Sequence, residues 1–464
     1  MEPVEIVQQM SVEEKVGQLF VIPASPERHD YHLKDLDYLF NQRHVGGIIY
    51  KQGSQSSYRT FLSLLPPSII RLGDAEWGVS MRVTDAVKYP RNLTLGAIQD
   101  LSLIERFGHQ VGWECRQLGI DINLAPVADI NSNPKNPIIG TRSFGDDPER
   151  VALLVSTVVK AMQEEGVLAC AKHFPGHGDV SVDSHVDLPV SKIGSLEPFR
   201  KALDAGAFLT AHLYIDGEVV TFSPRLVHDL IRDELHFPGL IITDALNMQA
   251  IMKYTKADEA ALNALKAGHD LLLYGDHISE KVDSMLQHDI PAAIDRIVRA
   301  VKEGEYPQSL LDSHVVRILE VKQKLIQRPP VKPMPLITNK ALELKQTLYD
   351  HAVTLVSNQH LPLNQDIQLT FVGGEAPLLK QTLAPYSKDK GLRVVCVLKW
   401  DEEAVRALNP DILIVMTTPY GLMNLPQPPT LLIGYENDPM AEESVRKVLF
   451  GEMEAVGKLP VKIY

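Results

Sequence analysis

The chain has 464 residues, of which 45% are hydrophobic and 23% are charged. This composition excludes a mainly disordered chain and a collagen-like one. The 59 Asp and Glu outnumber the 46 Lys and Arg, for a net charge of −13, so most of the surface repels phosphate and a nucleic-acid partner is not expected.

Eight short apolar runs alternate with helix-like stretches up to about residue 325. The runs are rich in Val, Ile and Leu, and most are too short for helices, which is typical of strands buried on both faces of a parallel sheet. We therefore predict a (β/α)8 TIM barrel over residues 1–327, with a doubly wound sheet as the alternative. The eight predicted strands are Gln18–Ala24, Val45–Tyr50, Ser68–Asp74, Ile120–Asp129, Val167–Phe174, Phe208–Tyr214, Gly239–Leu246 and His269–Gly275.

The composition changes near residue 329. The segment Arg328–Pro335 reads RPPVKPMP, which cannot continue a helix, and it predicts a stiff linker over residues 328–340. Residues 341–464 are then expected to form a smaller α/β domain with its own core. Its predicted strands are Ile367–Gly373, Leu392–Leu398, Asp411–Met416 and Thr430–Tyr435.

The cysteines and the N-terminal segment bear on the compartment. None of the three cysteines belongs to a Cys-x-x-Cys pair, which excludes a disulfide framework and a zinc ribbon. The first residues lack the basic region and apolar core of a secretory signal, and no run of about 18 apolar residues is present. We therefore expect a cytoplasmic protein with no membrane contact.

Ionisable residues recur at the same end of five successive predicted strands. Active sites of TIM barrels lie at the C-terminal ends of the strands and on the loops that follow, so this recurrence favours a functional site over a merely polar rim. We interpret His212 as a hydrogen-bonded core residue. The other ionisable residues at these ends are Asp74, Arg142, Lys172, His173 and Asp244.

The loop from Lys172 to His185 concentrates three histidines and two aspartates. Asp183 and His185 can form a dyad in which the carboxylate orients the imidazole for proton transfer near pH 7. A solvated polar loop is one alternative. Another is a divalent-metal site, although the loop has no His-x-His or His-Glu-x-x-His spacing. That metal site would draw on His173, His177, Asp179, Asp183 and His185.

Asp244 directly follows the apolar residues of the seventh predicted strand. A carboxylate there must meet a partner or solvent in the barrel mouth, and it is either a nucleophile or the N-cap of the next helix. Combined with a proton-transfer group, it fits retaining glycoside hydrolysis, in which one carboxylate attacks and a second group protonates the leaving oxygen. Sugar hydroxyls would then be bound through charge-assisted hydrogen bonds by Asp74, Arg142, Lys172 and His173.

These motifs resemble glycoside hydrolase family 3, specifically its bacterial β-N-acetylglucosaminidases. Residues Lys172–Gly178 (KHFPGHG), with Asp183–His185 (DSH) four residues later, match the signature of that group without a gap. The resemblance continues beyond residue 340, where two-domain members of the family carry an α/β sandwich. Further similar segments are Ser11–Phe20, Ala125–Asp129, Gly140–Gly145, Thr210–His212, Thr243–Met248, Val353–Val356 and Val448–Glu452.

The resemblance implies a role for each site residue. Asp244 would be the nucleophile that forms a covalent glycosyl-enzyme intermediate, and His185 the general acid/base with Asp183 as its partner. No metal or organic cofactor is implied. The usual substrate is a muropeptide, from which β-linked N-acetylglucosamine is removed in cell-wall recycling. The residues implied to hold that sugar are Asp74, Arg142, Lys172 and His173.

One segment departs from the family pattern. The third strand of family members usually ends in Asp-x-Glu-Gly-Gly with an arginine close behind, whereas Asp74–Arg82 reads DAEWGVSMR. Trp77 thus replaces a glycine, and its ring can narrow the sugar pocket or stack on a sugar. Three other functions remain open: a phosphorylase using the same site, a metal-dependent amidohydrolase, and a sugar-binding protein without turnover.

Overall fold

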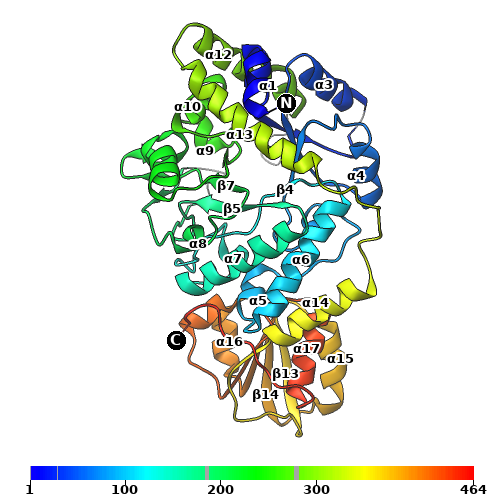
Figure 1. Ribbon diagram of the computed structural model, residues 1–464. Coiled ribbons are helices and arrows are strands. Elements are labelled where there is room, and N and C mark those ends of the chain that lie inside the picture. The colour runs from blue at the N-terminus through cyan, green and yellow to red at the C-terminus, as the bar shows by residue number, and fades with distance from the viewer. Residues whose placement is uncertain (1, 29, 183–187, 276–281, 464) are drawn as a thin grey trace.

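Eight parallel strands form a nearly closed barrel in the first 273 residues (Figure 1). The computed structural model describes residues 2–28, 30–182, 188–275 and 282–463. The strands are β1 (Phe20–Ala24), β2 (Gly47–Tyr50), β3 (Ile70–Gly73), β4 (Ile122–Asn123), β5 (Leu168–Phe174), β7 (Ala207–Thr210), β10 (Leu240–Thr243) and β11 (Leu272–Leu273). They pair in the order β10, β7, β5, β4, β3, β2, β1, β11, and Ile242 pairs with Leu271 where the two ends meet.

Each of these strands overlaps one predicted run, so the TIM barrel is confirmed and the doubly wound alternative is wrong. Every residue of β1, β2, β7 and β10 is buried. The barrel interior covers one face of each strand and the outer helices cover the other, which is why the runs are continuously apolar rather than alternating.

Helices alternate with the strands and surround the barrel (Figure 1). Helix α2 begins with a capping box, in which the Ser11 hydroxyl accepts from the Glu14 amide and the Glu14 carboxylate accepts from the Ser11 amide. A π-helical stretch covers residues 225–234. The larger helices are α1 (Pro3–Gln9), α2 (Val12–Gly17), α3 (Asp30–Asn41), α4 (Gln55–Leu62), α6 (Leu101–Gln117), α7 (Pro148–Glu164), α10 (Ala257–Ala267), α12 (Ile290–Lys302) and α13 (Gln308–Ile326).

Helices α6 and α7 lie side by side over β4 and β5 (Figure 1). A side chain at Gly108 of α6 would bring its Cβ to within 2.8 Å of the Ala161 Cβ on α7. The glycine therefore permits the close approach of the two helices. This packing holds β4 and β5, whose following loops carry site residues.

A second, five-stranded sheet lies beyond the linker, at the bottom of Figure 1. Its order is β12 (Thr354–Ser357), β16 (Thr430–Ile433), β15 (Ile412–Val415), β14 (Leu392–Val397) and β13 (Ile367–Val372). Within this sheet, only β12 is antiparallel to its neighbour, and it is the one strand of the sheet that we did not predict. The helices of this part are α14 (Asn339–Ala352), α15 (Pro377–Leu383), α16 (Glu402–Leu408) and α17 (Pro439–Leu449).

The two faces of the second sheet have different neighbours. One face, with Cys396 and Ile414, packs on apolar side chains of α14, α15 and α17. The other, with Val397 and Val415, belongs to the same apolar cluster as the barrel core. The second sheet is therefore covered on both sides, as an α/β sandwich requires.

The linker contains no helix or strand between residues 329 and 338. The barrel holds it through main-chain groups. Arg116 donates to the Pro329 carbonyl at 2.7 Å, and the Met334 amide donates to Gln117 at 2.8 Å. The proline-rich segment is thus fixed along the barrel wall rather than free.

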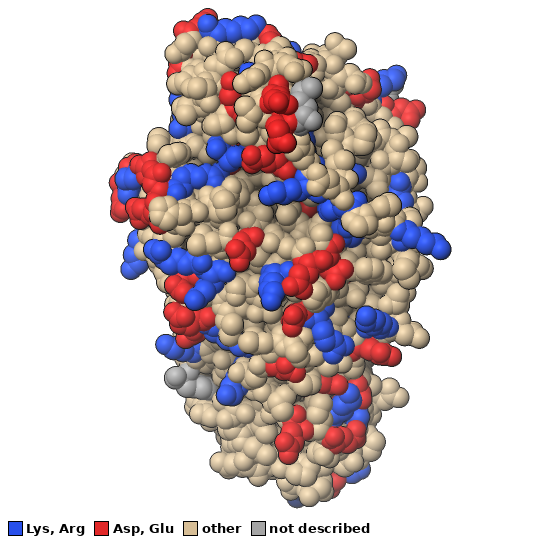
Figure 2. All heavy atoms as spheres, viewed as in Figure 1, with Lys and Arg blue, Asp and Glu red and all other residues tan. Residues whose placement is uncertain are grey.

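The described helices include none that is both long and apolar enough to cross a membrane. On the face shown in Figure 2, Lys and Arg side chains are interspersed with Asp and Glu and do not gather into a basic stripe. Such a mixed surface lacks the electrostatic footprint of a nucleic-acid-binding face.

Candidate active site

A cavity of about 280 Å³ opens where the barrel strands end. Five of the predicted site residues line it: Asp74, Arg142, Lys172, His173 and Asp244. The other two, Asp183 and His185, lie outside the described residues. Trp77, whose ring was expected to narrow the sugar pocket or stack on a sugar, also lines the cavity. Further lining residues that our sequence analysis did not assign to sugar binding include Glu76, Arg82 and His177.

A network of five charged side chains forms one wall of the cavity. Lys172, at the end of β5, bridges two carboxylates, with its Nζ 3.1 Å from Asp74 and 2.8 Å from Glu76. Arg142 donates two hydrogen bonds to the Glu76 carboxylate, at 3.0 and 2.6 Å. Arg82 donates to the other oxygen of Asp74 at 2.7 Å. The three cations and two anions lie on segments that follow three neighbouring strands.

Within the network, each charged side chain stabilises the charged form of its partners. Burial alone would raise the pKa of Glu76, but Arg142 and Lys172 outweigh it and lower that pKa to about 2. Lys172 and Arg82 likewise hold the pKa of Asp74 well below its usual value, against the effect of burial. The pKa of Lys172 is raised in turn, because its two carboxylate partners outweigh its burial. At neutral pH the wall therefore offers charged donors and acceptors, which suit hydroxyl groups.

The loop after β3 turns sharply to carry Glu76 and Trp77. Gly78 has a φ of +91°, and a Cβ there would come within 2.7 Å of the Tyr89 ring. Just beyond it, the Val79 amide donates to the buried Glu114 at 3.3 Å. This turn returns the chain toward Asp74, so that Arg82, eight residues later in the sequence, reaches that carboxylate.

Asp129, in the loop after β4, fixes the histidines that follow β5. Its carboxylate accepts from the His173 ring at 2.7 Å, from the His173 amide at 3.3 Å and from the His177 amide at 2.7 Å. His173 and its neighbours hold the pKa of Asp129 below its usual value despite burial. Our sequence analysis did not assign a role to Asp129. Its position at the end of the predicted strand Ile120–Asp129 was the available signal.

Asp244 follows β10 directly and is partly exposed in the cavity. Its amide donates to the Thr210 carbonyl at 3.2 Å, and its Oδ1 accepts from the Ala245 amide at 2.8 Å. The next helix, α9 (Gln249–Met252), takes Met248 as its N-cap. The N-cap interpretation of Asp244 is therefore wrong, and its side chain faces the cavity.

His212 has a different environment from the cavity histidines. Its ring nitrogens lie 2.7 Å from the Thr221 hydroxyl and 3.0 Å from the Ala245 carbonyl. The side chain is buried and does not line the cavity. This arrangement agrees with the interpretation of His212 as a hydrogen-bonded core residue.

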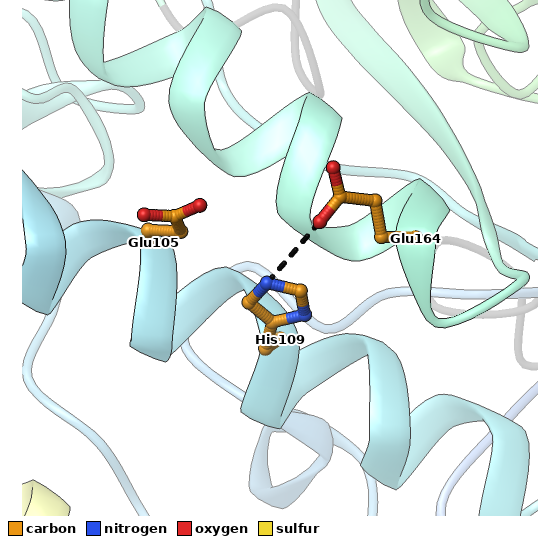
Figure 3. Close-up of side chains that lie close together, drawn as sticks. All are labelled: Glu105, His109 and Glu164. Atoms are coloured by element: carbon orange, nitrogen blue, oxygen red, sulfur yellow. Dashed lines mark ion pairs between the residues drawn. The ribbon is translucent and has the colours of Figure 1, made fainter.

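Side chains that could together hold a metal ion occur, within the described residues, only on the outer surface. One group is Glu105, His109 and Glu164 on α6 and α7 (Figure 3). There His109 is 3.4 Å from Glu164 and pairs more closely with Glu165, at 2.8 Å. The other is the exposed group His228, Asp229 and Asp233. Neither group includes a cavity residue.

The second sheet reaches the loops that frame the cavity. Glu436, which follows β16, accepts from the Arg91 amide and from the Thr94 hydroxyl, each at 2.7 Å. The Arg91 guanidinium lies 4.7 Å from the centre of the Trp77 ring and donates to Thr141 at 3.1 Å. Trp77, a cavity residue, is thus supported by an arginine whose backbone is held by the second domain.

Comparison with known proteins supports these observations. The family model for the glycosyl hydrolase family 3 N-terminal domain matches residues 11–321. Beta-hexosaminidase A of Pseudoalteromonas piscicida is 31% identical over 380 residues, which cover 73% of this chain and 61% of that protein. The beta-N-acetylglucosaminidase/beta-glucosidase of Cellulomonas fimi is 28% identical over 344 residues, or 68% of this chain and 58% of that protein. The chain therefore spans less than two thirds of either relative.

A solved structure is similar over almost the whole chain. It is a glycoside hydrolase family 3 beta-N-acetylglucosaminidase from Paenibacillus sp. str. FPU-7, with a TM-score of 0.82 and 28% identity. The similarity covers 98% of this chain and 99% of that one. The barrel and the second sheet thus occur together in that protein.

Proposed function

The chain belongs to glycosyl hydrolase family 3, and from that premise we propose that it is a retaining exo-β-N-acetylglucosaminidase. It releases terminal N-acetylglucosamine from β-linked glycosides through a covalent glycosyl-aspartate intermediate. The observation that carries this proposal is the cavity at the strand ends, because Asp244 lines it together with Lys172 and Arg142. The similarity to the Paenibacillus beta-N-acetylglucosaminidase supports the choice of sugar.

Asp244 acts as the nucleophile in the proposed mechanism. Its carboxylate attacks the anomeric carbon while His185, assisted by Asp183, donates a proton to the leaving oxygen. In the second step His185 removes a proton from water, which displaces Asp244 from the sugar. The roles of His185 and Asp183 rest on the match of the DSH motif to the family signature.

The charged wall binds the sugar in this mechanism. Its carboxylates accept hydrogen bonds from hydroxyl groups, and its cations donate to the hydroxyl oxygens. The cavity volume of about 280 Å³ lies just below the range of about 300–1,000 Å³ that is usual for small-molecule sites. This size suits one sugar residue and supports removal of a terminal unit. The residues that bind it are Asp74, Arg142, Lys172 and His173, with Glu76 and Arg82 completing the wall.

We propose a muropeptide as the natural substrate, so that the activity belongs to cell-wall recycling. The support for this finer assignment is the resemblance of Lys172–Gly178 and Asp183–His185 to the signature of bacterial enzymes that act on muropeptides. The aglycone would extend from the cavity mouth past Trp77, which departs from the family pattern.

The decisive experiment measures turnover of an aryl β-N-acetylglucosaminide beside the matching aryl β-glucoside. The unaltered protein should turn over the first, and Asp244→Ala should nearly abolish that rate. Asp233→Ala, which removes an exposed carboxylate from the outer surface of the barrel, is the matched control and should keep the rate. A rate for Asp244→Ala close to that of the control would refute the nucleophile assignment.

Further arms of the same assay separate the alternatives. His185→Ala should lose least on substrates with acidic leaving groups, because these need no protonation. Sugar phosphate formed only when phosphate is added would indicate phosphorolysis, and loss of activity with a chelator would indicate metal dependence. Tight N-acetylglucosamine binding without turnover would indicate a sugar-binding protein.

A further inference from the structure

His177 has a firmly held backbone, and its ring has no hydrogen-bond partner in the part of the chain that the structure describes. Its amide donates to Asp129 at 2.7 Å, and its carbonyl accepts from the Asn136 side chain at 2.7 Å. The carbonyl of the next residue, Gly178, accepts a hydrogen bond from the Asn133 amide at 3.1 Å. The two loops that follow β4 and β5 therefore fix this segment, and with it the direction of the His177 side chain.

The imidazole lacks hydrogen bonds to other described residues. The residue is only 3% exposed, and neither ring nitrogen has a hydrogen-bond partner among the described residues. The ring lines the cavity that also holds Asp244. The neighbouring His173 contacts it edge to face, with ring centres 6.0 Å apart, and uses its own Nδ1 on Asp129.

A buried polar group without a partner is costly, and such groups are rare in folded proteins. An apolar ring in this position would avoid the cost, so a histidine there indicates a partner that arrives with a ligand. Burial, reinforced by His173, lowers the pKa of His177 to about 4. At neutral pH the ring therefore carries one N–H donor and one acceptor nitrogen, which match the hydroxyl and amide groups of a sugar.

We propose that His177 is a further substrate-binding residue, whose imidazole hydrogen-bonds to the sugar that occupies the cavity. This inference rests on the proposed function, since it takes the cavity to be the N-acetylglucosamine site. His177 then has a different task from His185, because a neutral imidazole binds the sugar whereas the acid/base must exchange a proton in each step.

The test compares sugar binding with stability in the variant His177→Phe. This change removes both ring nitrogens and keeps an aromatic ring. Calorimetry with N-acetylglucosamine should show binding weakened about tenfold, the value expected for the loss of one net hydrogen bond. The melting temperature without sugar should stay the same or rise, because the ring makes no hydrogen bond with the residues that the structure describes. His177→Gln, which restores a donor and an acceptor, should recover part of the affinity.

His212→Phe is the matched control, because His212 is also a buried histidine but has hydrogen-bond partners at both nitrogens. It should lower the melting temperature. Equal N-acetylglucosamine binding by His177→Phe and the unaltered protein would overturn the role of His177 and leave the proposed function standing. A loss of stability in His177→Phe as large as in His212→Phe would also overturn it, by showing a structural role. Failure of the unaltered protein to bind the sugar would overturn both proposals.

Discussion

Glu76 offers a sharp test of the charged wall, because it is the anion shared by Arg142 and Lys172. Its side chain is fully buried, and its oxygens lie 2.6 Å from Arg142 and 2.8 Å from Lys172. The substitution Glu76→Gln keeps the shape of the side chain and removes its charge. Asp74 would then be the single carboxylate left in the network. The new amide nitrogen would face the N–H donors of Arg142 and Lys172, from which it cannot accept hydrogen bonds.

The size of the effect follows from the pKa of Glu76. Its decrease from 4.5 to about 2 corresponds to about 3 kcal/mol of stability, at about 1.4 kcal/mol per unit. An independent figure agrees, since breaking a buried ion pair by removing one partner costs about 3–5 kcal/mol. Because the folded-state pKa is the lower one, this stability is present above pH 4.5 and is lost as the pH falls through about 2.

Urea unfolding at pH 7 and at pH 3.5 checks this prediction. At pH 7, the free energy of unfolding of Glu76→Gln should be about 3 kcal/mol lower than that of the unaltered protein, and this difference should shrink at pH 3.5. The matched control is Glu305→Gln. Glu305 also has a pKa lowered to about 2, by Arg296 and Lys266, but it is exposed, so solvent screens its pairs and the change should be small. A difference that is absent at pH 7, or the same at both pH values, would refute the reasoning.

Three further predictions concern the cavity and its support. Burial raises the pKa of Glu114 to about 7, so the stability contributed by its protonated side chain is complete below about pH 4.5 and is lost as the pH rises through 7. The free energy of unfolding of Glu114→Gln should therefore gain up to about 3 kcal/mol on that of the unaltered protein between pH 5 and 8. Parallel curves of stability against pH for the two proteins would contradict this prediction. Trp77→Gly should raise KM for β-N-acetylglucosaminides about 2- to 12-fold with a smaller change in kcat, since an aromatic contact contributes about 0.5–1.5 kcal/mol; an unchanged KM would remove Trp77 from the sugar site. Asp244→Ala should keep N-acetylglucosamine binding, measured by calorimetry, while losing turnover, because a nucleophile is needed for the reaction more than for binding; retained turnover would count against it.

The barrel could be predicted because its strands are short, fully buried and separated by helices, a pattern that few other folds produce. The antiparallel strand β12 could not, because its residues Thr354–Ser357 are partly exposed and follow α14 without a turn signal. Strand β4 was predicted too long: it covers only Ile122–Asn123. Farther along the predicted run, Val127 forms an isolated bridge with Lys172 of β5, and the run leads into the loop that carries Asp129.

The position of residues at the strand ends predicted five that line the cavity, but it did not predict their ion-pair partners. Asp74, Lys172 and Asp244 each end an apolar run, which is visible in the sequence. Glu76 lies three residues past the end of β3, and its pairing with Arg142 joins positions 66 residues apart. Such pairings depend on how neighbouring loops fold over the barrel mouth, and no local pattern records them.

The turn after β3 explains how a departure in sequence can leave a site intact. Replacing a small residue by Trp77 would be expected to displace the arginine that partners Asp74, because the family pattern keeps the two close. Here the chain turns at Gly78 and forms a short helix, Val79–Met81, which brings Arg82 to Asp74 at 2.7 Å. The space beside Trp77 is taken by Arg91, whose backbone is held by Glu436 of the second domain. Asp74 therefore keeps an arginine partner, and Trp77 lines the same cavity. If this cavity is the sugar site that we propose, we expect Trp77 to influence selectivity among β-linked glycosides.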